Sequence, residues 1–169
     1  MGHKSHLLQN EVLVDAYSYV MNETGASHHV VVHNVTGQSG VGGILDDADS
    51  IVKFPDVAYT SGERVAGVLL SEVVNYDLSR THLNDKKRQS QVGGKVSVMK
   101  IGTIVTNNIA AGAVPGPGLK AYGTTDGKFT VVSDALLNST TRLLAIKPVG
   151  TFRSAKDTDG YCRIDILVM

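Results

Sequence analysis

Apolar and polar residues alternate with a period of two along most of this chain, which is the pattern of β-strands that bury one face. The segment HHVVVHNV at 28–35 contains a run of β-branched residues and predicts a strand. The segment GTFRSAKDTDGYCRIDILVM at 150–169 alternates on both sides of the turn sequence DTDG, so it predicts a β-hairpin. Period two therefore describes the chain better than the period of 3.6 that a helix requires.

A further long segment, residues 94–109, predicts two short strands. Val96 and Val98 lie on one face of the first strand, and Lys100 continues the same face. Gly102 then predicts a bend, because an isolated glycine weakens the interior of a strand. Residues 104–105 belong to the second strand.

Turn sequences rich in glycine, aspartate and proline separate the strands. TDGK at 125–128 predicts a tight hairpin in which Asp126 and Gly127 are able to adopt positive φ. DTDG at 157–160 repeats the same turn, with Gly160 in the equivalent position. The chain therefore contains two predicted hairpins of one kind.

Two segments are candidates for helices. Arg64 to Asp77 fits a helix or an extended chain, since it contains consecutive valines and an internal glycine. Asp134 to Ile146 begins with a residue that can cap a helix, although the Asn, Ser and Thr residues at 138–141 weaken its centre. The chain is predicted to be mainly β, with at most one or two short helices.

The composition fits one domain, or two small domains that share a core. Of 169 residues, 42% are hydrophobic, and 18 glycines with no tryptophan favour many turns and short strands. Lysine plus arginine equal aspartate plus glutamate at 16 each, so no bulk attraction to nucleic acid or to an anionic membrane is expected. No segment has the roughly 18 apolar residues of a membrane span, and the N-terminus lacks the apolar run of a signal peptide. The protein is expected to remain in a cytosol or to leave the cell without secretion.

The balanced charge conceals an asymmetry between the two halves of the chain. Residues 11–77 hold ten acidic and two basic side chains, whereas residues 78–169 hold six acidic and thirteen basic ones. The halves can pair with each other, or they can offer complementary edges to further copies of the chain. The sequence leaves both interpretations open.

No metal or cofactor site is predicted. His29 and His33 lie on one face of a strand, but their spacing of four differs from the usual spacing of two, and no carboxylate is near in sequence. The acidic run at 46–49 lacks the residue pattern of a calcium loop. The glycine-rich run at 39–43 lacks the lysine of a phosphate-binding loop. A half-exposed strand accounts for the histidines, and a solvated turn accounts for the acidic run.

No catalytic site is predicted either. The single cysteine, Cys162, excludes an intramolecular disulfide and lies in an apolar–polar alternation, so it is interpreted as a small strand residue rather than a nucleophile. The basic run at 84–91 has no aromatic residue close by, which favours a solvated loop over a nucleic-acid contact. A hydrolase would need its general base among four histidines: His28, His29, His33 and His82.

Several segments in the last two-thirds of the chain resemble the capsid decoration proteins, or cement proteins, of tailed bacteriophages. The family has the elements G-x-x-V-A-G-V-L-L, V-V-N-x-D-L-[ST]-R, Q-x-G-G-K-V and G-x-[VI]-V-T-N, and this chain has GERVAGVLL, VVNYDLSR, QVGGKV and GTIVTN. These segments follow the family's order, at Gly62–Leu70, Val73–Arg80, Gln91–Val96 and Gly102–Asn107. GPGLKAYGTTDGKFTV at 116–131 and VGTFRSAKDTDGYCRIDI at 149–166 are similar to two hairpins of the family.

The resemblance implies a small β-barrel, or a β-tulip or jelly-roll-like sandwich, without a cofactor and without enzymatic activity. It implies a structural virion protein that is made in the host cytoplasm and binds the outer surface of a phage capsid. There a homotrimer would bridge neighbouring subunits of the major capsid protein and stabilise the expanded head. Nucleic acid and membranes are not expected partners. The alternative is another β-sandwich binding module, in a virion or for carbohydrate, without catalytic activity.

The chain is predicted to have a mobile N-terminal arm over residues 1–10 and a single β-rich domain over 11–169. Within the domain, residues 11–60 supply lead-in strands and residues 61–169 match the family. Chain ends are commonly mobile unless something docks them.

The arm carries the predicted capsid contacts. Lys4 and His6 precede an apolar pair, Leu7 and Leu8, and no turn sequence ties this segment to the domain. Burial of two leucines against a shell is worth roughly 3–6 kcal/mol before the entropy of ordering the arm is subtracted. These four side chains are therefore predicted to lie against a capsid subunit or a neighbouring protomer.

Overall fold

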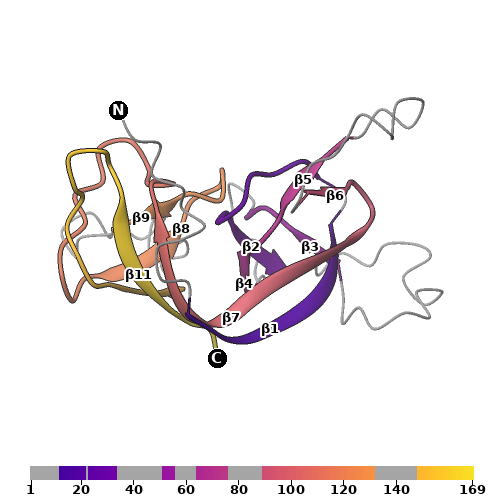
Figure 1. The fold of residues 1–169 in the computed structure, drawn as a ribbon, viewed down its shortest axis with the longest axis horizontal. Helices are drawn as coiled ribbons and strands as arrows, with labels where there is room; N and C mark the ends of the chain where they lie inside the picture. Colours follow the sequence, from indigo (N-terminus) through magenta and orange to yellow (C-terminus); the bar gives the residue numbers. More distant parts are fainter. Residues whose placement is uncertain (1–11, 22, 34–50, 56–63, 76–88, 132–147) are drawn as a thin grey trace, which may run out of the picture.

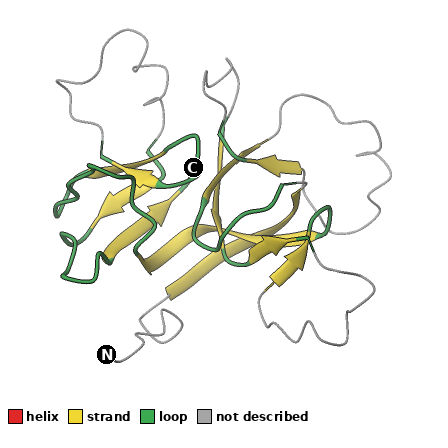
Figure 2. Cartoon of the chain, turned by 90° about the horizontal axis from the view of Figure 1, so that it is seen from above, coloured by secondary structure: helices red, strands yellow, loops and turns green. Residues whose placement is uncertain are grey.

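The computed structural model of the protein describes residues 12–21, 23–33, 51–55, 64–75, 89–131 and 148–169. These residues form strands joined by loops and turns, with no helix among them (Figure 2). Nothing in the described part is therefore a helix long and apolar enough to cross a membrane. The strands are β1 (Val12–Met21), β2 (Val30–His33), β3 (Ile51–Lys53), β4 (Val65–Leu69), β5 (Glu72–Val74), β6 (Gln89–Gln91), β7 (Lys95–Thr106), β8 (Lys120–Gly123), β9 (Phe129–Thr130), β10 (Gly150–Phe152) and β11 (Cys162–Leu167).

Five strands close into a barrel in the order β1, β3, β2, β4 and β7, because β7 pairs with β1 as well as with β4. The β1–β3 pair is parallel and the other pairs of the barrel are antiparallel. The prediction of a mainly β fold of the small-barrel kind is confirmed. A buried cluster fills the barrel and consists of Tyr19, Met21, Val31, Val52, Ala66, Leu69, Val73, Val96 and Val98.

A second lobe lies beside the barrel and shares β7 with it (Figure 1). In this lobe β7, β11, β10, β8 and β9 are hydrogen-bonded neighbours. β9 then meets the chain that follows β7: the N–H of Phe129 donates to the carbonyl of Asn108 at 2.9 Å, and the N–H of Ala110 donates to the carbonyl of Phe129 at 2.7 Å. The second lobe is therefore closed by backbone hydrogen bonds between β9 and the chain that follows β7.

The two lobes are packed together through an apolar cluster. Residues of the second lobe supply most of it, namely Ile104, Ala121, Phe129, Val149, Phe152, Cys162, Ile164 and Ile166. The barrel adds Val30, Val65, Val68 and Met99. β2 and β4 are thus buried on both faces, with the barrel interior on one side and the second lobe on the other. This double burial accounts for their uninterrupted apolar sequences, VVV and VAGVL, because a strand with one wet face would alternate.

The predicted division of residues 94–109 into two short strands at Gly102 is wrong. Lys95 to Thr106 form one continuous strand of twelve residues that runs from the barrel into the second lobe. Gly102 is held extended from both edges, since it stands opposite Leu13 of β1 and Ile166 of β11. A glycine that is hydrogen-bonded in a ladder on both sides keeps the strand continuous, and the local sequence does not reveal those partners.

The first helix candidate, Arg64 to Asp77, is extended where the structure describes it, because it contains β4 and β5. β5 pairs in parallel with β6, and Val73 of β5 also exchanges two backbone hydrogen bonds with Gly25. The second helix candidate, Asp134 to Ile146, lies outside the described residues.

Both predicted hairpins are confirmed. β8 pairs with β9 around the TDGK turn, and β10 pairs with β11 around the DTDG turn. The glycine of each turn has positive φ, 72° for Gly127 and 84° for Gly160. The prediction of positive φ for Asp126 is wrong. Among the described residues other than glycine, positive φ occurs at His28, with a value of 63°.

The two turns share one hydrogen-bonding scheme. In the first, the N–H of Thr124 donates to the carbonyl of Lys128 at 2.8 Å, and the Thr124 hydroxyl accepts the N–H of Lys128 at 3.0 Å. In the second, the N–H of Asp157 donates to the carbonyl of Tyr161 at 2.9 Å, and the Asp157 carboxylate accepts the N–H of Tyr161 at 2.8 Å. A short polar side chain at the first position therefore closes each turn.

Candidate functional site

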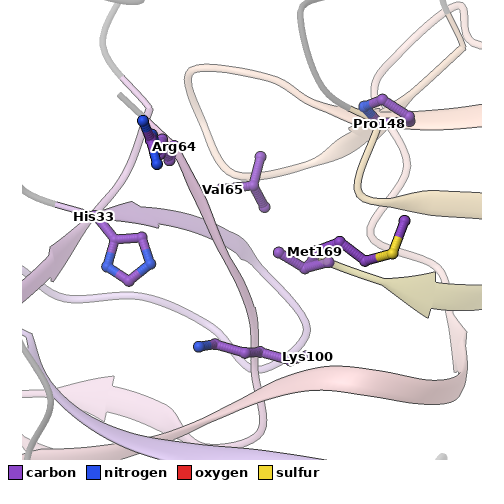
Figure 3. A pocket seen from close by; sticks show the side chains of 7 residues that line it. His33, Arg64, Val65, Lys100, Pro148 and Met169 are labelled. Atoms are coloured by element: carbon purple, nitrogen blue, oxygen red, sulfur yellow. The ribbon is translucent and has the colours of Figure 1, made fainter. Parts of the chain in front are cut away.

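A pocket of about 220 Å³ is lined by residues from both lobes (Figure 3). Three of its lining side chains are basic: His33 at the end of β2, Arg64 immediately before β4, and Lys100 in the middle of β7. The other lining residues are apolar, namely Val65, Pro148, Val168 and Met169. No acidic residue is among the described residues that line it.

Backbone pairing brings these distant segments together. The N–H of His33 donates to the carbonyl of Arg64 at 2.8 Å, which places the end of β2 beside the start of β4. The N–H of Val168 donates to the carbonyl of Lys100 at 3.0 Å, which places the chain after β11 beside the middle of β7. The pocket is thus a product of strand register rather than of a mobile loop.

Aromatic rings hold two of the basic side chains. The ammonium nitrogen of Lys100 lies 4.0 Å from the centre of the Tyr17 ring and 5.6 Å from that of Tyr19. The His33 ring packs edge-on against Tyr19, with 5.5 Å between the ring centres. Tyr19 is fully buried, and its hydroxyl has no hydrogen-bond partner in the described part of the chain. The electron-rich ring faces favour a cation at this place.

The described lining of the pocket offers no hydroxyl, thiol or carboxylate that His33 could activate as a nucleophile, because it contains no Ser, Thr, Cys, Asp or Glu. The described lining therefore combines three basic side chains with an apolar wall.

His29 lies apart from this pocket and packs edge-on against Phe54, with 5.3 Å between the ring centres. Burial lowers the pKa of His29 below its usual value; the side chain of Asn108 opposes this effect, and the positive charge of Lys128 adds to it. Its Nδ1 atom has no hydrogen-bond partner among the residues described. In those residues no group of three or more His, Cys, Asp or Glu side chains is arranged to hold a metal ion.

Cys162 is a buried strand residue, as its position in the sequence pattern indicates. Burial raises the pKa of its thiol to about 11, with a smaller opposing effect from Lys156. It borders a shallow groove of about 620 Å³ along the closing hairpin, together with Arg153, Tyr161 and Arg163. A thiol in this setting remains protonated near neutral pH and is a poor nucleophile.

Most of the side chains singled out in the sequence lie outside the described residues. This applies to all four predicted capsid contacts, Lys4, His6, Leu7 and Leu8. It also applies to the runs at 39–43 and 46–49, to 84–88 of the basic run, and to His82. Of the ten acidic residues at 11–77, seven lie outside the described residues, so the pairing of the two halves stays a prediction.

Sequence reasoning missed the pocket itself. One local signal was present, since Lys100 continues the face that carries Val96 and Val98, where a charged residue is unexpected. Arg64 gave no such signal, because its neighbours His33 and Lys100 are brought close only by strand pairing.

The described surface offers few aromatic side chains for stacking on a sugar ring. Tyr17 is the one described aromatic residue that is exposed, at 39%, and Lys100 covers its ring. The described surface therefore gives no support to the carbohydrate-binding alternative, which depends on exposed aromatic platforms.

No protein-family model matches this chain, and no curated protein is significantly similar to it. The segments that resemble decoration proteins can nevertheless be placed in the fold. They contribute β4, part of β5, both ends of β7, the β8–β9 hairpin and the β10–β11 hairpin. β4, β7, β11, β10, β8 and β9 are consecutive in the nine-stranded sheet, whereas β5 lies with β6 in the two-stranded sheet.

Proposed function

We propose that this chain is a structural protein of a tailed-phage virion that binds the outside of the capsid and stabilises the expanded head. In this role it bridges neighbouring subunits of the major capsid protein, acts as a homotrimer and requires no cofactor. It is made in the host cytoplasm and carried on the capsid exterior.

The observation that carries the proposal is the order of the resembling segments along the chain. Each short segment is a weak signal alone, and they are scattered over about a hundred residues of sequence. In the fold, five of the six segments supply strands of the nine-stranded sheet, including the strand that both lobes share, whereas Val73–Arg80 begins in β5 of the separate two-stranded sheet. Six segments that resemble one family in the family's own order support the proposal more strongly than any one of them alone.

The architecture suits a protein whose task is to hold other subunits in place. Buried side chains fill both the barrel and the space between the lobes, so the body resists deformation. A ligand that binds only the assembled, expanded shell stabilises that shell by RT ln(1 + [L]/Kd) at each site. Many equivalent sites on one shell multiply the effect.

The proposal is tested by measuring the mass of the purified protein in solution and then mixing it with undecorated, expanded heads. We expect a trimer on the heads, co-sedimentation with them, and greater resistance of the decorated heads to heat or chelators. Unexpanded heads serve as the control and should bind less. A monomer that never sediments with expanded heads would rule the proposal out.

A further inference from the structure

We propose that the loop between β7 and β8, residues 107–119, is the surface through which copies of this chain contact one another around a symmetry axis. The inference deepens the proposed function, since it rests on the homotrimer for the number of copies. Binding to a capsid plays no part in it.

The loop exposes several apolar residues to solvent. Val114 is 80% exposed and Leu119 is 43% exposed, and Ala111 and Pro117 are exposed as well. Single apolar residues are common on protein surfaces, whereas several in one short segment are typical of an interaction site. The loop is therefore a candidate contact surface.

The loop also carries no charge. From Ile101 to Leu119 the sequence contains no Asp, Glu, Lys, Arg or His. Residues close to a symmetry axis meet the same residues of the other copies, so any charge there would face its own sign. A surface that binds a different protein instead gains specificity from charges that complement those of its partner. The absence of charge therefore favours a second copy of this chain as the occupant.

Two tight turns shape the loop. Each turn has a backbone hydrogen bond between its first and fourth residues, at 3.2 Å for 110–113 and at 3.1 Å for 116–119. The third residue of each turn is a glycine with positive φ, 80° for Gly112 and 84° for Gly118. This is the arrangement of a type II turn, and Pro117 restricts φ at the second position of the second turn.

The second turn is joined to the sheet by a pair of hydrogen bonds. The N–H of Gly118 donates to the carbonyl of Phe152 in β10 at 2.8 Å, and the N–H of Phe152 donates to the carbonyl of Leu119 at 2.8 Å. Pro115, which lies between the two turns, is buried. A loop held in this way presents its apolar side chains already ordered, which lowers the entropic cost of association.

Sedimentation equilibrium of the full chain tests the proposal. We expect the intact chain to associate as its concentration rises, and Val114→Lys to weaken this association at least about tenfold, because like charges of neighbouring copies then meet. Leu167→Lys is the matched control, since Leu167 is an apolar side chain of β11 that is 50% exposed. The control should associate like the intact chain. Equal weakening by both variants would contradict the assignment to this loop.

A mixture of two variants distinguishes contact between copies from contact with a different surface. Val114→Lys and Val114→Glu should each associate weakly alone, whereas their equimolar mixture should associate more tightly than either, because opposite charges then meet. A mixture that associates no better than the separate variants, with native spectra for both, would overturn the proposal. An intact chain that stays monomeric up to about 1 mM would do the same.

Sedimentation with expanded heads separates this inference from the proposed function. Association in solution that depends on position 114, without binding to heads, would support the inference and contradict the role on a capsid. An unchanged association of Val114→Lys in solution, together with lost retention on heads, would mean that the loop contacts another protein. That result would overturn the inference and leave the role on a capsid intact.

Discussion

The backbone N–H of Val30, in β2 of the barrel, donates a hydrogen bond to the carbonyl oxygen of Gly127 in the β8–β9 turn, at 2.7 Å. This bond joins the two lobes in addition to β7, the strand that they share. The neighbouring contact is similar, since the side-chain amide of Asn108 donates to the carbonyl of His28 at 3.1 Å. These two hydrogen bonds join the lobes in addition to the shared strand β7. The TDGK turn is therefore part of the interface between the lobes as well as the connection between β8 and β9.

Replacement of Gly127 by alanine should destabilise the protein far more than the same change at Gly160. Both residues have positive φ, which costs a residue with a Cβ roughly 1–2 kcal/mol. A Cβ at Gly160 would meet nothing within 4 Å, whereas at Gly127 it would lie 2.9 Å from the Phe54 ring and 3.0 Å from the carbonyl oxygen of Val30. We therefore expect losses of about 1 kcal/mol for Gly160→Ala and about 3 kcal/mol or more for Gly127→Ala, measured by urea unfolding. Equal losses would mean that the turn does not pack against the barrel.

Acidification should destabilise the fold through His29. Burial lowers the pKa of His29 in the folded protein, so the folded state disfavours its protonated form. The unfolded chain takes up a proton near its ordinary pKa of about 6.5, and stability is lost as the pH falls below that value towards the folded pKa. The urea midpoint should fall between about pH 7.5 and pH 5.5, and His29→Gln should reduce this slope. His33→Gln, the control, should retain the contribution of His29. A slope that is the same in His29→Gln as in the parent protein would contradict the prediction.

Cys162 should react slowly with thiol reagents while the protein is folded. Burial raises its pKa to about 11, so at pH 8 roughly one thiol in a thousand is ionised, and the side chain is almost inaccessible. Labelling at pH 8 should therefore be slow in buffer and fast in urea. Cys162→Ala should cost about 1 kcal/mol and leave head binding intact. Rapid labelling of the folded protein, or loss of head binding in the alanine variant, would indicate a functional thiol.

Removal of residues 1–10 should weaken retention on heads without changing the thermal melt of the free protein. The proposed arm contributes through Leu7 and Leu8, whose burial against the shell offsets the entropy of ordering it. The expected result is a lower bound fraction after washing, measured by sedimentation of decorated heads. Decoration and protection equal to those of the intact chain would mean that the arm has no such role.

Features that depend on residues adjacent in the chain could be predicted from the sequence. The two aspartate–glycine turns, the run of valines in β2 and the structural character of Cys162 all follow from short-range patterns, and the structure confirms them. The continuity of β7 at Gly102 did not follow, because it depends on pairing with Leu13 and Ile166. The pocket has the same cause: Arg64 and His33 meet only through strand register. Pairing between distant segments was the information that one sequence could not supply.

β11 lies between β7 and β10 in the sheet, although it is the last strand in chain order. β1 likewise pairs with a strand that lies far away in the sequence, since Val12 pairs with Thr103 of β7. The barrel cannot close before β7 has been synthesised, and the second lobe cannot close before β11 has been synthesised. Pairs so far apart in sequence pay the loop-closure entropy before they gain contacts. The β2 and β4 segments, apolar on both faces, have to stay soluble during that delay, which makes this interval the period of greatest exposure to aggregation. Closure of the barrel therefore depends on β7, and closure of the second lobe depends on β11, so in both lobes an early segment needs a partner that follows much later in the sequence.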